Sequence, residues 1–198
     1  MKRIAVFASG NGSNFEAIAK AIEQGRIDAE LALLVANRKD AYVLERAKQH
    51  QVDTLVLTLK ECGSKEKYEE IIVEHLKRKS IDLVCLAGYM LYCGEVLLSH
   101  YEGKIINLHP ALLPSFKGAH GILDAYRYGV KVYGVTIHYV DRDIDTGKII
   151  DQRAFYDEGY TYEQIEEKIH ALEHELYPIV IQKLLKEKQN EKSINQCK

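Results

Sequence analysis

Two polar residues at the end of one short apolar run are the first candidates for chemistry in this sequence. The run Ile105–Leu108 is typical of a buried strand, and Pro110, which has no N–H to donate, ends it. Side chains alternate along a strand, so Asn107 and His109 project to the same side at its carboxyl end. A carboxamide and an imidazole placed together can both donate hydrogen bonds to one developing negative oxygen. The same two residues would also suit a plain strand cap.

The elements that must position these residues alternate along the first half of the chain. The expected strands before Asn107 cover 3–8, 29–36, 53–57 and 81–87. The expected helices between them cover 15–24, 42–50, 65–79 and 96–100. This alternation predicts βαβ units, a parallel sheet and right-handed crossovers. Ligands bind at the carboxyl ends of the strands in such sheets, which is where Asn107 lies.

The pattern changes after Asn107. A short helix is expected at 122–128, and two extended runs follow at 132–140 and 149–155 with a turn-rich segment between them. Two runs so close together, with no helix between them, must pair antiparallel. A capping box at 161–164 begins a last helix, whose apolar face carries Ile165, Ile169, Leu172 and Leu176.

These elements predict one α/β domain at 1–185, followed by a polar, frayed tail at 186–198. The expected architecture is a Rossmann-like, open, mostly parallel sheet that is flanked by helices and has an antiparallel edge in its C-terminal part.

Composition restricts the class of protein. A chain of 198 residues suffices for one sizeable domain, and 46% apolar with 28% charged residues is ordinary for a globular protein. A net charge of -2 offers no basic surface, so we expect neither nucleic acid nor a membrane as a partner. No apolar run reaches membrane-spanning length, and the four cysteines form no CxxC pair, which together predict a cytoplasmic protein. The cysteines are Cys62, Cys85, Cys93 and Cys197. The sequence leaves the oligomeric state open.

A glycine-containing loop, Gly10-Asn11-Gly12-Ser13-Asn14, follows the first expected strand. Backbone N–H groups at the start of the next helix suit a phosphate, and Ser13 and Asn14 can add side-chain hydrogen bonds. Phe15 stands where a dinucleotide fingerprint needs its third glycine, and the Lys-Ser/Thr pair of a P-loop is absent. The loop by itself therefore fits either a monophosphate site or a tight turn without a ligand.

Two further motifs match hydrolase patterns by residue type. His170-Ala171-Leu172-Glu173-His174 has the spacing of an inverted zincin, but no third ligand is marked, and a charged, solvated helix face explains the motif more simply. Ile144–Gly147 resembles the triplet of aspartic proteases, although an aspartate in a Gly-terminated turn is the simpler interpretation. We therefore expect no metal site.

Taken together, several blocks of the sequence resemble the folate-dependent formyltransferases. Asn107–Gly118, with the sequence NLHPALLPSFKG, carries most of the resemblance, and Asp141–Gly147 follows downstream. The segments 12–14, 86–90 and 173–174 narrow the likeness to the branch of the family that acts in purine synthesis. The resemblance implies that the chain transfers a formyl group from 10-formyltetrahydrofolate, a co-substrate, to the amine of a phosphorylated ribosyl-glycinamide. Both partners would be small molecules.

The resemblance extends from about residue 2 to 185 and implies a role for each candidate residue. By matching positions, Gly12, Ser13 and Asn14 would hold the substrate phosphate. Glu173, with the backbone around His170, would hold the ribosyl-glycinamide. The folate pocket would be formed by Lys65, Met90, Leu91, Tyr92, Cys93, Asn107, Asp141, Arg142, Asp143, Ile144 and Asp145. The catalytic trio would be Asn107, His109 and Asp145.

The chemistry of the trio supports such a transfer independently. An amine is already a nucleophile, so the enzyme needs orientation and charge stabilisation rather than an acyl-enzyme intermediate. Asn107 and a protonated His109 can stabilise the tetrahedral oxyanion, while Asp145 can keep the imidazole charged and help to move protons.

Other proteins of the superfamily are the nearest alternatives. Formyltetrahydrofolate deformylase carries an extra N-terminal domain and methionyl-tRNA formyltransferase an extra C-terminal domain, whereas this chain starts at a strand near Arg3 and has only a short tail. We therefore expect neither. From a different class, a nucleotide-binding module would keep the loop at Gly12 but would not need Asn107, His109 and Asp145 together.

Overall fold

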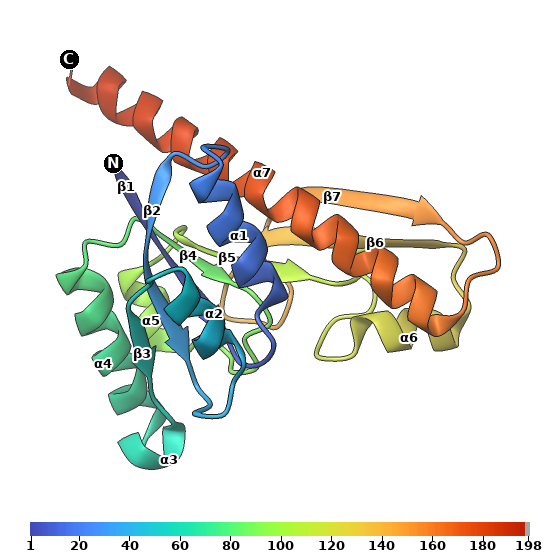
Figure 1. Ribbon diagram of the computed structural model, residues 1–198, viewed down its shortest axis with the longest axis horizontal. Helices are drawn as coiled ribbons and strands as arrows, with labels where there is room; N and C mark the ends of the chain where they lie inside the picture. The colour runs from blue at the N-terminus through green and yellow to red at the C-terminus, as the bar shows by residue number, and fades with distance from the viewer. Residues whose placement is uncertain (197–198) are drawn as a thin grey trace.

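Seven strands form one mixed sheet at the centre of the protein (Figure 1). The computed structural model describes residues 1–196. The strands are β1 (Lys2–Ala8), β2 (Ala29–Ala36), β3 (Thr54–Val56), β4 (Leu83–Leu86), β5 (Ile105–His109), β6 (Val132–Tyr139) and β7 (Ile149–Tyr156). Their order across the sheet is β3-β2-β1-β4-β5-β6-β7. Strands β1 to β5 are parallel, whereas β6 and β7 pair antiparallel, so the expected sheet with an antiparallel C-terminal edge is confirmed.

Helices cover both faces of this sheet (Figure 1). One face carries α1 (Ser13–Glu23), α2 (Val43–Gln49), α6 (Gly121–Tyr128) and α7 (Tyr162–Gln196). The opposite face carries α3 (Leu59–Cys62), α4 (Lys65–Arg78) and α5 (Glu95–His100). All of these except α3 begin within a few residues of the expected positions, and all except α3 and α7 also end there. The four-residue α3 starts from a capping box between Thr58 and Glu61, a signal that the sequence analysis missed.

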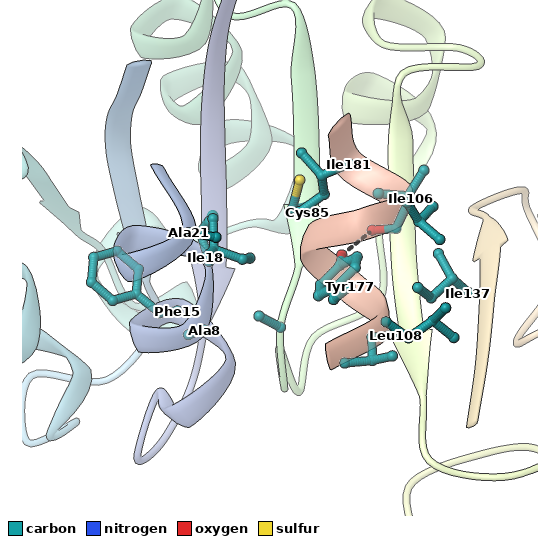
Figure 2. Packing of buried hydrophobic residues seen from close by; sticks show 14 of the residues in the cluster. Ala8, Phe15, Ile18, Ala21, Cys85, Ile106, Leu108, Ile137, Tyr177 and Ile181 are labelled. Atoms are coloured by element: carbon teal, nitrogen blue, oxygen red, sulfur yellow. Dashed lines mark hydrogen bonds between the residues drawn. The ribbon is translucent and has the colours of Figure 1, made fainter. Parts of the chain in front are cut away.

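The apolar layer between the sheet and the helices α1 and α7 holds α7 in place across the sheet (Figure 2). Tyr177 of α7 is fully buried there, and its hydroxyl contacts the carbonyl oxygens of Leu86, at 2.9 Å, and Ile106, at 3.2 Å. A helical residue four positions earlier lies on the same face, one turn away. Tyr177 therefore holds Glu173 toward the ends of β4 and β5.

The end of the chain differs from the expected frayed tail at 186–198. Helix α7 continues to Gln196, and residues 197–198, which include Cys197, lie outside the described residues. Lysine, glutamate and glutamine have high helix propensity, so a polar segment can prolong a helix that is packed further upstream. Among residues 1–196, no helix has both the length and the apolar character needed to cross a membrane.

Candidate active site

A cavity of about 1030 Å³ lies at the carboxyl ends of the parallel strands. It occupies the point where β1 neighbours both β2 and β4, so that the strand order reverses there. Ligands of open α/β sheets bind at such a reversal. The volume is at the upper end of the range for a single small-molecule site, so two small ligands can share it.

The cavity brings together nearly all the residues that the sequence analysis singled out. Its walls include the loop 12–14, the segment 90–93, Asn107 with His109, the loop 141–145, and His170 with Glu173. These segments come from five different parts of the chain: three follow β1, β4 and β6, Asn107 and His109 lie at the end of β5, and the last pair belongs to α7. The structure therefore supports one shared site, while the role of each residue stays a prediction.

Lys65 is the candidate residue that does not line the cavity. Its ammonium group donates to the carbonyl oxygen of Tyr92 and lies 3.4 Å from a carboxylate oxygen of Glu69. Lys65 therefore supports the segment 90–93 from outside the cavity.

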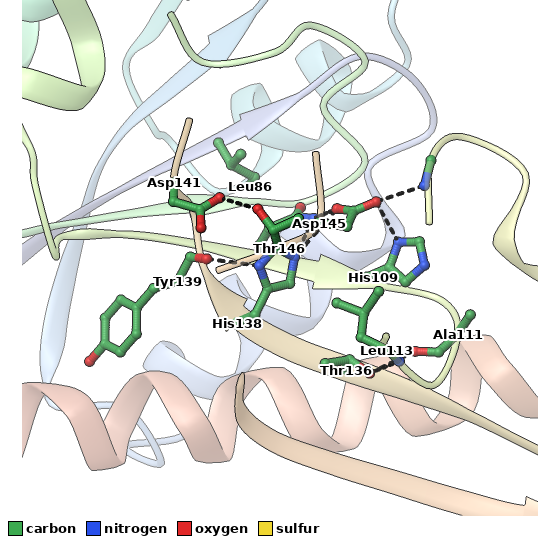
Figure 3. Close-up of polar contacts among 12 residues, drawn as sticks. Leu86, His109, Ala111, Leu113, Thr136, His138, Tyr139, Asp141, Asp145 and Thr146 are labelled. Atoms are coloured by element: carbon green, nitrogen blue, oxygen red, sulfur yellow. Dashed lines mark hydrogen bonds and ion pairs between the residues drawn. The ribbon is translucent and has the colours of Figure 1, made fainter. Parts of the chain in front are cut away.

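Asn107 and His109 meet Asp145 at the end of β5. The Asn107 amide donates to Oδ1 of Asp145 over 3.4 Å, and Nδ1 of His109 lies 3.4 Å from Oδ2 (Figure 3). Asp145 belongs to the loop between β6 and β7, and the N–H of Gly118 fixes its Oδ2 at 2.8 Å. Gly147 lets this loop pass close to β6, because a Cβ there would lie 1.7 Å from the Tyr139 carbonyl oxygen.

A second buried histidine, His138 of β6, completes this cluster and was missed by the sequence analysis (Figure 3). Its Nε2 lies 3.4 Å from Asp145 and 3.2 Å from the amide nitrogen of Asn107. Its Nδ1 donates to the Tyr139 carbonyl oxygen over 2.8 Å. The pairing of β5 with β6 sets His138 directly opposite Asn107. The only signal in the sequence was a histidine near the end of an apolar strand.

Both ring nitrogens of His109 face acceptors. Nε2 donates to the Phe116 carbonyl oxygen over 2.8 Å, and Nδ1 faces Asp145. A doubly protonated ring would satisfy both acceptors. However, burial lowers the pKa of His109 by more than Asp145 and the Phe116 carbonyl raise it. The lowered pKa therefore favours a neutral ring in this structure over the expected standing cation, and Asp145 is an acceptor ready for a second proton.

Asp145 itself stays ionised. Burial opposes its ionisation, but hydrogen bonds from His138 and from the N–H of Gly118, with the charge that His109 carries when it is protonated in acid, outweigh burial and lower the pKa of Asp145. The carboxylate therefore favours a proton on the His109 imidazole.

The loop after β5 is fixed by a buried threonine of β6 (Figure 3). The Thr136 hydroxyl accepts from the Leu113 N–H over 3.0 Å and donates to the Ala111 carbonyl oxygen over 2.7 Å. Gln152 of β7 donates to the same hydroxyl oxygen and to the Leu113 carbonyl oxygen, over 2.9 Å and 3.0 Å. These bonds hold the segment whose Phe116 carbonyl restrains His109.

The loop 10–14 presents the start of α1 to the cavity. Gly12 is the N-cap of α1 with a φ of 77°, and a Cβ there would lie 2.3 Å from Cγ2 of Val43. Both the backbone conformation and the close approach of α2 therefore require glycine. Within residues 1–196, no side chain caps α1, so the N–H groups of its first turn are available to an anion.

Arg46 of α2 holds this loop from the side. It donates to the carbonyl oxygen of Asn11 over 2.9 Å and to the Asn11 side-chain oxygen over 3.0 Å. Its third nitrogen lies 3.3 Å from Glu16. The loop is therefore fixed by a two-point contact, with a positive charge close to it.

Glu173 joins the loop 10–14 to α7. It is 4% exposed, and its Oε2 accepts from the Asn14 amide over 3.0 Å and lies 2.9 Å from Nδ1 of His170. The hydrogen bond to Glu173 raises the pKa of His170. The interpretation of this helix face as solvated is wrong at Glu173, because Tyr177 turns that position toward the sheet.

Two buried polar atoms beside Glu173 are unpaired within the described residues. Oδ1 of Asn14 and Nε2 of His174 have no hydrogen-bond partner among residues 1–196. Burying an unpaired polar atom is costly, so such atoms indicate a bound group or water. His174 also lines the cavity and was missed, although the sequence analysis had noted its motif. Among the described residues, no group of three histidine, cysteine or acidic side chains is placed to hold a metal ion.

Comparison with known proteins places this chain in one family. The family model described as formyl transferase matches residues 2–181, so the chain belongs to the formyl transferase family. Phosphoribosylglycinamide formyltransferase of Bacillus subtilis (strain 168) is 49% identical over 186 residues, which cover 93% of this chain and 95% of that protein. The enzyme of the same name from Haemophilus influenzae is 35% identical over 183 residues, which cover 91% of this chain and 86% of that protein. The crystal structure of phosphoribosylglycinamide formyltransferase from Bacillus halodurans shares 50% identity and a TM-score of 0.90, over 93% and 95% of the two chains.

Proposed function

We propose that this protein transfers the formyl group of 10-formyltetrahydrofolate to the amine of 5-phosphoribosylglycinamide, a step of purine synthesis. The observation that carries the proposal is the cluster of Asn107, His109 and Asp145 in a cavity large enough for two small molecules. The names of the relatives, which are similar over nine-tenths of the chain, support the choice of substrates.

The phosphate of the ribosyl substrate would bind the loop 12–14, where the N–H groups of α1 lack a capping side chain among residues 1–196. The unpaired Nε2 of His174 and Oδ1 of Asn14 support a polar substrate beside that loop. Glu173 and His170 would then orient the ribosyl-glycinamide. The segments 90–93 and 141–145 would form the wall against the folate.

The transfer needs no covalent enzyme intermediate, because the substrate amine attacks the formyl carbon directly. The attack forms a C–N bond, places a negative charge on the formyl oxygen and leaves an extra proton on the amine. The Asn107 amide donates to that oxygen. Neutral His109 takes the extra proton, and Asp145 stabilises the imidazolium that results.

The same proton then completes the reaction. The imidazolium of His109 protonates N10 of the folate, the bond from the formyl carbon to N10 breaks, and the carbonyl forms again. The products are the N-formyl compound and tetrahydrofolate, and His109 returns to its neutral form. The lowered pKa of His109 therefore suits its role as the initial base.

We further propose that the reaction requires no metal, since the substrate amine is already a nucleophile and loses its extra proton to His109 after the attack. Cys62 and Cys93, which form no disulfide within residues 1–196, support a reducing, cytoplasmic setting. The net charge of -2 supports small molecules, rather than nucleic acid or a membrane, as partners.

The test is to titrate the two substrates separately and together while following tetrahydrofolate, N-formyl product and free formate. Formyl transfer predicts that tetrahydrofolate and the N-formyl product appear in equal amounts and only when both substrates are present. Release of formate from the folate alone, unaffected by the ribosyl substrate, would identify a deformylase and overturn the proposal.

A further inference from the structure

Glu69 of α4 is a buried carboxylate that the transfer chemistry does not use. Its exposed fraction is 2%, and it does not line the cavity. The N–H of Gly94 donates to its Oε1, the N–H of Leu97 donates to its Oε2 over 3.1 Å, and Lys65 lies 3.4 Å from Oε1. A buried charge is costly unless ionic and hydrogen-bonding partners surround it, and these three groups are such partners.

The two N–H groups belong to the start of α5. Gly94 is the N-cap of this helix and Leu97 is its third residue, so both positions need an acceptor from outside the helix. Gly94 has no side chain to supply one. Glu69 therefore provides, from a neighbouring helix, the cap that α5 cannot provide itself.

This cap fixes the wall assigned to the folate, because Gly94 directly follows the segment 90–93. Lys65 donates to the Tyr92 carbonyl oxygen, so the ion pair of Lys65 with Glu69 holds the backbone at Tyr92 and at Gly94. Met90 and Tyr92 are 62% and 64% exposed, so side-chain packing contributes little to placing these two residues.

The carboxylate of Glu69 also packs closely against Gly94. A Cβ at this position would lie 2.9 Å from the Oε2 of Glu69. The φ of Gly94 is −94°, which any residue can adopt. A side chain here would therefore meet the Glu69 carboxylate rather than strain the backbone, and Gly94→Ala displaces that carboxylate from the opposite side.

We propose that Glu69 is a positioning residue for the folate: it holds the segment 90–93 in its binding conformation without touching the ligand. This role rests on the proposed function, since it assigns that segment to the folate. Loss of the contact should weaken folate binding and leave the phosphate loop, which is held separately by Arg46, unaffected.

The experiment compares Glu69→Gln and Gly94→Ala with Glu70→Gln, a matched change at an exposed glutamate of the same helix. Glutamine keeps one acceptor oxygen but places an NH₂ against one of the two N–H groups. Losing one hydrogen bond to a charged acceptor predicts a rise of about tenfold or more in the KM for 10-formyltetrahydrofolate. The KM for the ribosyl substrate and kcat at saturation should stay within about threefold of wild type, and Glu70→Gln should match wild type.

Calorimetric titration with tetrahydrofolate, together with thermal unfolding, separates positioning from loss of fold. If Glu69→Gln does not fold, Gly94→Ala retains the carboxylate and decides the question. Folded variants that bind tetrahydrofolate like wild type, or that lose both substrates equally, would overturn the positioning role. A wild-type protein that binds tetrahydrofolate but transfers no formyl group would overturn the proposed function instead, and the titration would still test Glu69.

Discussion

Asp145→Asn is the most informative single change in the cavity, because it preserves the shape of the side chain while removing its charge. The carboxylate is 11% exposed and lies 3.4 Å from the His109 ring, which is 3% exposed. At that separation and an effective dielectric constant of about 20, attraction to an imidazolium is about 5 kcal/mol. Full loss of this attraction would slow the reaction by about 10³–10⁴-fold. The asparagine oxygen retains part of the attraction, so we expect kcat/KM to fall by about 10²–10³-fold.

The assay is kcat/KM against pH for wild type, Asp145→Asn and Asp124→Asn, the last being an exposed carboxylate of α6 that serves as control. Without Asp145, burial acts on the His109 pKa with less opposition, so the acid limb of the profile should move to lower pH. Activity within about threefold of wild type near neutrality, or an unmoved acid limb, would show that Asp145 is only a turn residue.

The same variant carries a stability prediction with a definite sign. The pKa of Asp145 is lowered in the folded protein, so its charge stabilises the fold above the unfolded value of about 3.9, and this contribution is lost as pH falls through the folded pKa. Asp145→Asn should therefore unfold at lower denaturant concentration than wild type at pH 7, and the difference should shrink in strong acid. A difference that does not depend on pH would mean that packing, not charge, is responsible.

Three further predictions test other parts of the molecule. Ser13→Ala with Asn14→Ala should raise the KM for the ribosyl substrate, by an amount worth about 1.5–3 kcal/mol for each lost bond to the charged phosphate. Folate binding in a titration should stay near wild type. An unchanged KM would show that the phosphate does not bind this loop. Exhaustive chelation followed by elemental analysis should leave a fully active, metal-free enzyme, whereas activity lost with EDTA and restored by zinc would refute this. Burial lowers the pKa of His50, but its bonds to Glu23 and Glu16 raise it more, so its contribution to stability is present below about pH 6.5 and lost as pH rises through the folded pKa. Denaturant midpoints should therefore differ between His50→Gln and wild type more at pH 5.5 than at pH 9, and equal differences at both would contradict the assignment.

The sheet could be predicted where apolar runs are bounded by clear turn signals. Strand β2 occupies 29–36 as expected, because eight apolar or half-buried residues stand between polar segments. The antiparallel pair β6–β7 followed from two extended runs with no room for a helix between them. The helix α3 has four residues, too few to show a periodicity, so its capping box was the signal in the sequence that could have predicted it.

The register between strands could not be predicted, and it decides the composition of the catalytic cluster. The sequence placed Asn107 and His109 on one strand, where alternation alone relates them. His138 joins them only because β6 pairs with β5 so that His138 is opposite Asn107. A shift of one residue would turn His138 to the other face of the sheet. The spacing of 31 residues between the two positions carries no trace of that register.

The direction of the His109 pKa shift could not be predicted for a related reason. The sequence identified both opposing influences, burial and a neighbouring carboxylate, but their relative size depends on how completely the ring is enclosed. The ring is buried under the loop that Thr136 holds, and burial outweighs Asp145.

Charged residues on helices were the hardest to interpret, because the sequence cannot say which of them serve backbone groups at the ends of the strands. Irregular loops there have no ladder partners, so their N–H and carbonyl groups need partners from elsewhere. Two charges meet that need with opposite signs: Arg46 of α2 donates to the Asn11 carbonyl, and Glu69 of α4 accepts from the N–H of Gly94. They act from opposite faces of the sheet, on the loop assigned to the phosphate and on the segment assigned to the folate. The loop assigned to the phosphate and the segment assigned to the folate can therefore be perturbed separately, through Arg46 and through Glu69. This is why we expect changes at the two sites to affect the KM values of the two substrates separately.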